Sequence, residues 1–386
     1  MRTTFGSFNI ANSGLFASRK ALDVTSHNIA NANTEGYSRQ IHKQRASLPI
    51  WGDTKGITGT GVEIYNIERI RNEYLDKKYW NQNRAFGEWQ IKQESLEKME
   101  AIFNEPSDTG IRQAIDEFFL ALDELSKKTG DSTSRVAVVE RANILARTIN
   151  RNGNEIITSI REANEEIKSK VDQINSIASQ IAVLNKQIFN MELGDSIAND
   201  LRDQRNVLID KLSKIIDIEV STNKDKHNNE YLSIKIGGIT LVEHLDYYEL
   251  DYVQEDVPGV TDLGAGKIAK IVWKGLESQE VKVEGGELRG LLDIRDGDGE
   301  GLNYRGLVYY LNKLNEFARD FSNKINEIHR KGYDFNGEAG RDFFNVPKEG
   351  PNAINCLNFA VNAELLANPD LIAASSEFSE ISNNNN

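Results

Sequence analysis

The chain has 386 residues, 39% hydrophobic and 27% charged, which is the composition of a soluble globular protein with room for two or three domains. Its formal net charge of −13 disfavours a nucleic-acid partner because phosphates would be repelled. The single cysteine, Cys356, excludes an internal disulfide, and no apolar run approaches the length of a membrane span.

The first forty residues carry a helical pattern with two rows of side chains. The large residues recur every seven positions, and a small residue follows each of them by three: Phe8, Leu15, Leu22 and Ile29, with Ala11, Ser18, Thr25 and Ala32. On a helix these two rows form one narrow seam of alternating large and small residues. A single helix cannot bury its own seam, so the pattern predicts a packing partner, in the same domain or on another helix.

Residues 31–40 predict a defined loop at the end of this helix. Asn and Gly end helices and tolerate left-handed backbone, so Asn31, Asn33 and Gly36 are expected to supply positive φ values. Tyr37 is expected to anchor the loop, and Gly36 is expected to be its most sensitive residue.

The next part of the chain predicts mainly long helices. Residues 40–60 are rich in Gly and Thr and predict irregular backbone with short strands, and residues 64–103 have the apolar spacing of one long helix. A helix of roughly sixty residues is expected from residue 131. It contains an unbroken heptad row: Ile160, Ile167, Ile174, Ile181 and Ile188. Antiparallel packing within the chain is favoured over a coiled coil between chains.

At residue 217 the apolar period changes from helical to alternating, which predicts strands. Gly237 and Gly238 are expected to form a turn between two of them. Residues 217–285 hold fourteen acidic and seven basic residues and are interpreted as a β-rich domain inserted between helices. Helices are expected again over residues 287–295 and 302–331.

The predicted fold class is therefore mainly α with an inserted β-domain, in an elongated multi-domain chain. Four segments are expected: 1–60 as N-terminal helix and loop, 61–216 as the first part of a helical body, 217–285 as the β-rich domain, and 286–386 as the return part of the body with a C-terminal tail.

No group of residues predicts catalysis, a cofactor or a metal. The five histidines are scattered along the chain: His27, His42, His227, His244 and His329. None has a second histidine at the spacing of a zinc site. Residues 296–301 resemble the start of a calcium loop, but Leu307 stands where a bidentate Glu is needed. We therefore expect a protein that is not an enzyme and that binds no cofactor.

Residues 26–40, with the sequence SHNIANANTEGYSRQ, resemble the N-terminal signature of the bacterial flagellar axial proteins, the family of rod, hook and hook-associated proteins. The ending at residues 37–40 is similar to that of the hook-associated members and differs from the Lys-containing ending of rod and hook members. Residues 286–296 and 325–337 resemble segments of the same hook-associated members.

The resemblance implies a structural adaptor at the junction of hook and filament, needed for filament assembly on the hook. The implied partners are copies of itself in a ring, the hook protein, the next hook-associated protein on the filament side and an export chaperone, with no nucleic acid and no membrane. The implied location is the extracellular flagellum, reached through type III export without cleavage of a signal peptide. The family also has a long C-terminal helix that pairs with the N-terminal helix, and residues 286–386 do not include it.

Subunit contacts are expected from the seam and the loop that follows it. The residues concerned are Phe8, Ala11, Leu15, Ser18, Leu22, Thr25, Ile29, Asn31, Asn33, Thr34, Gly36, Tyr37 and Arg39. Two alternatives remain open at this point. One is a hook or rod protein of the same family, which would form long polymers alone. The other is a cytoplasmic coiled-coil binding protein with its site in the β-domain.

Overall fold

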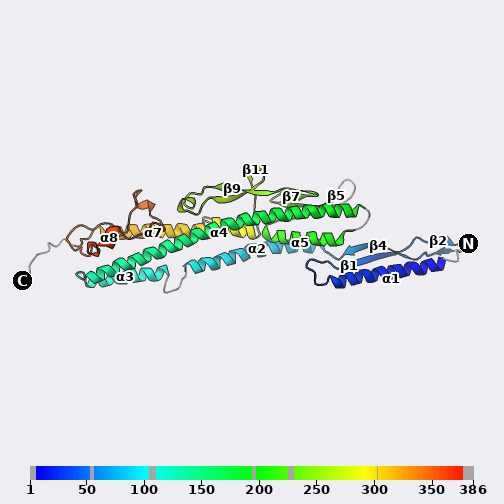
Figure 1. Ribbon diagram of the computed structural model, residues 1–386, viewed down its shortest axis with the longest axis horizontal. Helices are drawn as coiled ribbons and strands as arrows, with labels where there is room; N and C mark the ends of the chain where they lie inside the picture. Colours follow the sequence, from blue (N-terminus) through cyan, green and yellow to red (C-terminus); the bar gives the residue numbers. More distant parts are fainter. Residues whose placement is uncertain are drawn as a thin grey trace, which may run out of the picture. The chain divides into compact units, whose positions relative to one another are not determined.

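The computed structural model describes residues 6–52, 56–103, 110–193, 197–224, 230–301 and 303–376. Helices dominate these residues, and small antiparallel sheets accompany them, which confirms the predicted mainly α class (Figure 1). The chain divides into two compact units, each built from three stretches of sequence. The first unit comprises the described residues of Met1–Glu88, Ser169–Tyr252 and Ile271–Arg289, and the second those of Trp89–Lys168, Val253–Lys270 and Gly290–Asn386.

The N-terminal part of the first unit is one helix packed on a hairpin. Helix α1 (Gly6–Ala30) lies along strands β1 (Gln40–Ala46) and β4 (Val62–Arg69), which pair antiparallel (Figure 1). Between them, β2 (Ile50–Gly52) and β3 (Gly56–Thr58) form a second short pair. The strands expected between residues 40 and 60 are therefore present.

The prediction of one helix over residues 64–103 is wrong at its start. Ile64 and Ile67 lie in β4, where the backbone pairs with β1, and helix α2 (Glu73–Phe103) begins only after Asn72. The Asn72 Oδ1 atom accepts a hydrogen bond from the Tyr74 N–H at 3.0 Å, as a helix-capping side chain does. Isoleucines three apart fit a helix, but pairing with β1 gives this segment its backbone hydrogen bonds as a strand.

The rest of the first unit consists of helices beside a four-stranded sheet. The end of helix α4 (Ser132–Glu192), helix α5 (Asn199–Ile215) and the start of α2 provide the helices. The sheet has the order β5-β6-β7-β8. Its strands are β5 (Glu219–Lys224), β6 (Glu230–Ile236), β7 (Ile239–Glu243) and β8 (Asp246–Tyr247). The predicted turn between β6 and β7 is confirmed, with positive φ at Gly237 and Gly238.

The second unit has an aromatic core. It contains the start of α4, the end of α2, and helices α3 (Ile111–Lys127) and α7 (Leu307–His329). Phe118 of α3 is fully buried against Phe343 and Phe344 of the C-terminal part, which also carries the short helix α8 (Ala363–Ala367). The helix predicted over residues 302–331 starts later, at Leu307. Before it, Asp298 and Arg305 form an isolated bridge.

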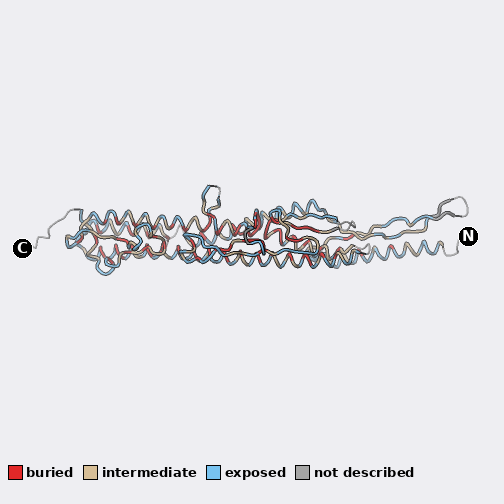
Figure 2. The backbone as a smooth tube through the Cα atoms, turned by 90° about the horizontal axis from the view of Figure 1, so that it is seen from above, coloured by how far each residue is buried: buried red, intermediate tan, exposed pale blue. Residues whose placement is uncertain are grey.

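The predicted heptad row of α4 is buried inside the chain. Ile160, Ile167, Ile174 and Ile181 have no exposed surface, and Ile188 is 4% exposed. In the second unit, Ile160 shares the core with Met99 of α2. The long helix and its packing within one chain are therefore confirmed, and the buried stretches appear red in Figure 2.

Residues 217–285 contribute to both units. Strands β5–β8 belong to the first unit, whereas Val260, Ala265 and Ile268 belong to the core of the second. Residues 217–285 also form a sheet of order β11-β10-β9. It consists of β9 (Leu250–Glu255), β10 (Ile268–Trp273) and β11 (Leu276–Glu280), and helix α6 (Glu287–Asp296) follows it. Whether residues 217–285 can be excised as a separate domain stays a prediction.

Cys356 gives a first test of the packing in the second unit. Its side chain is fully buried and lies close to Gly153 of α4. Burial raises the pKa of the Cys356 thiol to about 12, so little reactive thiolate exists at pH 8. We expect Ellman's reagent to label the native protein very slowly, and to label one thiol per chain at once in denaturant. Fast labelling of the native protein would contradict this packing.

Candidate functional site

The predicted seam of α1 lies on the exposed side of the helix. Phe8, Leu15, Leu22 and Ile29 expose 66%, 68%, 66% and 72% of their surface. The small residues between them, Ala11, Ser18 and Thr25, are exposed as well. The pattern placed Ala32 on the helix, but α1 ends at Ala30 and Ala32 lies exposed in the turn that follows. The opposite face carries the buried residues of α1 and packs on β1 and β4. In the described part of the chain, nothing covers the seam, and pale blue dominates this helix in Figure 2.

The loop after α1 turns with helix-like hydrogen bonds. The Asn31 N–H donates to the His27 carbonyl at 3.1 Å, and the Thr34 N–H donates to the Asn31 carbonyl at 3.0 Å. Neither Asn31 nor Asn33 has a positive φ, so the prediction of left-handed backbone at these two residues is wrong. Among the described residues, the one non-glycine with positive φ is His244. Gly36 has φ +76°, as predicted.

Asn28 fixes the end of α1 to the start of β1. Its Nδ2 donates to the Gln40 carbonyl at 2.9 Å, and its Oδ1 accepts from the Gln40 N–H at 2.8 Å. The Tyr37 hydroxyl donates to the same Oδ1 at 2.8 Å. One amide side chain therefore holds the helix, the loop and the strand together.

The first turns of α5 hold the loop from the other side. Asp203 is 5% exposed, and its two oxygens accept from Arg69 Nη1 at 2.7 Å and from the Ser38 N–H at 2.8 Å. Asp200 Oδ1 accepts from Gln40 Nε2 at 2.7 Å. Burial lowers the pKa of the Arg69 guanidinium, and the hydrogen bond to Asp203 opposes that effect. We call this group the joint: Asn28, Tyr37, Gln40, Arg69, Asp200 and Asp203.

Gly36 lies against α5 with no room for a side chain. A Cβ atom at this position would lie 1.9 Å from Val207 Cγ2, far inside van der Waals contact. The positive φ and the close approach both require glycine here. The loop is thus held against α5 by packing as well as by the polar contacts of the joint.

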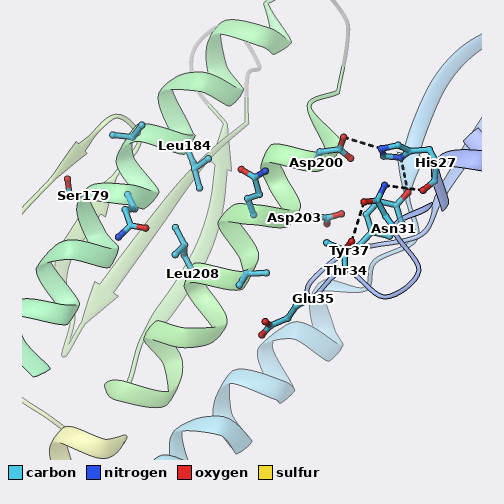
Figure 3. A pocket seen from close by; sticks show the side chains of 14 residues that line it. His27, Asn31, Thr34, Glu35, Tyr37, Ser179, Leu184, Asp200, Asp203 and Leu208 are labelled. Carbon is cyan, nitrogen blue, oxygen red and sulfur yellow. Dashed lines mark hydrogen bonds and ion pairs between the residues drawn. The ribbon is translucent and has the colours of Figure 1, made fainter. Parts of the chain in front are cut away.

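A pocket of about 670 Å³ opens between the loop, α4 and α5 (Figure 3). Aliphatic side chains line it: Val183 and Leu184 from α4, with Val207 and Leu208 from α5. The polar residues around it include His27, Glu35, Tyr37, Asp200 and Asp203. Burial raises the pKa of the Tyr37 hydroxyl, with smaller contributions from Asp200 and Asp203.

The structure places the predicted site residues in two groups. The seam residues lie along α1, whereas Asn31, Thr34, Gly36 and Tyr37 lie in the loop beside α5. Asn33 and Arg39 have exposed side chains, and the Arg39 carbonyl accepts from the Ile70 N–H at 2.8 Å at the base of the hairpin.

The sequence interpretation missed most of the joint. Asn28 and Gln40 flank the recognised loop residues, and Arg69, Asp200 and Asp203 lie more than one element away in sequence. The sequence around these α5 residues carries no local signal for the contacts. Asn199, in the same turn of α5, also contacts the hairpin, since its Nδ2 donates to the Ile67 carbonyl at 2.8 Å.

The contacts of the joint hold and orient the backbone of the loop and of the hairpin. Within the described ranges, no three His, Cys, Asp or Glu side chains are grouped as a metal site would require, and His227 lies outside those ranges. The described helices also include none that is long and apolar enough to cross a membrane.

The chain is similar to known flagellar proteins over most of its length. The family model of the flagellar hook-associated protein FlgK helical domain matches residues 96–344, and the model of the flagella basal body rod protein matches residues 8–37. Flagellar hook-associated protein 1 of Bacillus subtilis is 33% identical over 370 residues, which cover 89% of this chain and 71% of that protein.

Two further comparisons cover less of the matched protein. Flagellar hook-associated protein 1 of Salmonella typhimurium is 30% identical over 88% of this chain, which spans 59% of that protein. The flagellar hook junction protein FlgK from Burkholderia pseudomallei has a TM-score of 0.54 and 26% identity, covering 69% of this chain and 47% of that chain. The helical-domain family model matches residues 96–344, and the Bacillus subtilis protein is 33% identical over 89% of this chain and 71% of its own length. The chain therefore belongs to the family of flagellar hook-associated protein 1, FlgK.

Proposed function

We propose that the chain is a structural adaptor of the bacterial flagellum, placed between hook and filament and needed for filament assembly on the hook. Membership of the hook-associated protein 1 family supports this role. The single observation that links this role to particular residues is the exposed seam of α1. The seam is an apolar stripe that nothing in the described chain covers. A helix with such a stripe gains stability when another helix buries it.

The proposed partners are other subunits of the same assembly. Copies of the chain would form a ring, the hook protein would lie on one side, and the next hook-associated protein on the other. An export chaperone would accompany the chain before type III export, which would proceed without signal-peptide cleavage to the extracellular flagellum. The proposed role needs no catalysis, cofactor, nucleic acid or membrane.

A charged seam tests this role. Leu15→Asp combined with Leu22→Asp should change the free energy of unfolding by less than about 1 kcal/mol, because both side chains are already mostly exposed. In a strain that lacks the native gene, this variant should be exported but should leave cells without filaments, with filament subunits in the medium. Filament number by electron microscopy and filament protein in the supernatant measure the effect.

The control places two aspartates away from the seam and changes the net charge by −3, one unit more than the seam variant, because Lys20 is basic. Asn9→Asp combined with Lys20→Asp changes exposed residues on the flank of α1 and should leave filament number near the native value. Normal filaments with the Leu15 and Leu22 variant would show that the seam is not an assembly surface.

A further inference from the structure

The hydrogen bonds around His27 fix where its protons lie. The Gln40 backbone sets the orientation of the Asn28 amide, because it gives one N–H to Oδ1 and takes one from Nδ2. Oδ1 of Asn28 is therefore an acceptor, and the Tyr37 hydroxyl must donate to it. The Tyr37 oxygen lies 3.0 Å from His27 Nδ1 and has no second proton, so Nδ1 must carry the proton and donate.

With the proton on Nδ1, the Nε2 atom of neutral His27 is an acceptor, and it lies beside a carboxylate oxygen of Asp200, which is also an acceptor. His27 Nε2 lies 3.6 Å from Asp200 Oδ2, and an ionised carboxylate can only accept. Figure 3 shows the His27 ring and the Asp200 carboxylate facing each other at the pocket. A nitrogen that lies beside this pair, at about 2.9 Å from each acceptor, can donate one hydrogen to each of them.

The surrounding charges favour a cationic donor. The residues that line the pocket include three carboxylates, Glu35, Asp200 and Asp203, and no lysine or arginine. Arg69 neutralises Asp203, which leaves Glu35 and Asp200, both exposed, to give the pocket its charge. A lysine or arginine side chain from outside would meet a negative site.

The apolar side chains that line the pocket indicate which other groups a bound segment would need. Val183 is 54% exposed on α4, and Leu184, Val207 and Leu208 are only partly buried around the same pocket. The methylene stem of a long cationic side chain packs on such a surface while its charged end reaches a polar partner. An aliphatic neighbour in the same segment would cover the remaining apolar area.

We propose that this pocket binds a protein segment in which an arginine or lysine stands next to an aliphatic residue. One cationic nitrogen of that side chain donates one hydrogen to His27 Nε2 and another to Asp200 Oδ2, and the apolar part of the segment lies on Val183 and Val207. The inference deepens the proposed subunit-contact role of the loop after α1, and its place in the flagellum rests on that proposed function. The seam on α1 and this pocket are then two separate contact surfaces of one N-terminal element.

The test uses the purified full chain labelled with ¹⁵N-histidine at pH 8. His27→Gln identifies the His27 signals, which should show a protonated Nδ1 and an unprotonated Nε2. Acetyl-Leu-Arg-Leu-amide should shift the His27 Nε2 signal saturably below about 10 mM. The same peptide with citrulline, which has the shape of arginine without the charge, should bind at least about tenfold more weakly.

Two variants make the test specific. Asp200→Asn keeps an oxygen for Gln40 and should reduce binding of the arginine peptide at least about fivefold, with an unchanged melting temperature. Asp172→Asn, at an exposed position of α4 that does not line the pocket, should leave binding unchanged. A protonated Nε2, equal binding of the two peptides, equal binding to Asp200→Asn, or no saturable shift at all would each overturn the proposal. None of these readouts involves flagellar assembly, so the charged-seam experiment can succeed or fail independently of this one.

Discussion

Gly36→Val is expected to give a folded, exported chain that is poorly incorporated at the hook. Gly36 has φ +76°, where a β-branched residue costs roughly 1–2 kcal/mol of backbone strain. The new Cβ would also lie 1.9 Å from Val207 Cγ2, and such overpacking costs about 1–3 kcal/mol more. The loop must move away from α5, which changes the direction of α1 while the cores of both units stay intact.

The measurements are motility in soft agar, filament number, and filament subunits in the medium. Gly259→Val is the matched control, because Gly259 has φ +77° and open space around its Cβ position. This control should carry the backbone strain and keep normal filaments. In addition, Val207→Ala should restore part of the function of Gly36→Ala, since it removes the Cγ2 atom that would clash. Normal motility of Gly36→Val would show that the loop is only a tether.

Asp203→Ala is expected to destabilise the first unit by about 3–5 kcal/mol, the usual cost of breaking a buried ion pair from one side. The substitution removes the acceptor of both the Arg69 guanidinium and the Ser38 N–H. The Arg69 side chain is only 14% exposed, so water cannot fully replace the lost carboxylate. Urea unfolding followed by circular dichroism measures the change.

A double-mutant cycle separates the ion pair from simple loss of packing. Arg69→Met combined with Asp203→Ala should cost clearly less than the sum of the two single changes, since neither charge is then left buried alone. The exposed pair of Arg45 and Glu63 is the control, and Glu63→Ala should cost about 1 kcal/mol or less. Additive costs at Arg69 and Asp203 would show that the joint is not energetically coupled.

Repeating patterns in the sequence predicted the elements that repeat in the structure. The heptad isoleucines of α4 share one face, which is buried, and the seven-residue rows of α1 share one face, which is exposed. Helix geometry alone decides which residues share a face. Gly36 was predictable for a similar local reason, since the loop needs one left-handed residue. The pattern predicts a helix over β4 because Ile64 and Ile67 are spaced three apart, and only the pairing of β4 with β1 decides against it.

The joint could not be predicted from local pattern. Asp203 contacts Ser38 and Arg69 from 165 and 134 residues away, and nothing near Asp203 in the sequence distinguishes it from a solvated carboxylate on a helix surface. The same holds for the pocket below the loop. Its acceptor pair forms only when the folded chain brings His27 and Asp200 together.

The most direct measurement of the account is the accessibility of the seam in the free chain and in the assembled flagellum. A Leu22→Cys variant in a Cys356→Ser background carries one reactive thiol on the seam, and Val24→Cys carries one on the buried face of the same helix. We expect fast maleimide labelling of position 22 in the purified chain, strong protection of position 22 in isolated flagella, and slow labelling of position 24 in both. Equal labelling of position 22 in the purified chain and in flagella would contradict this expectation.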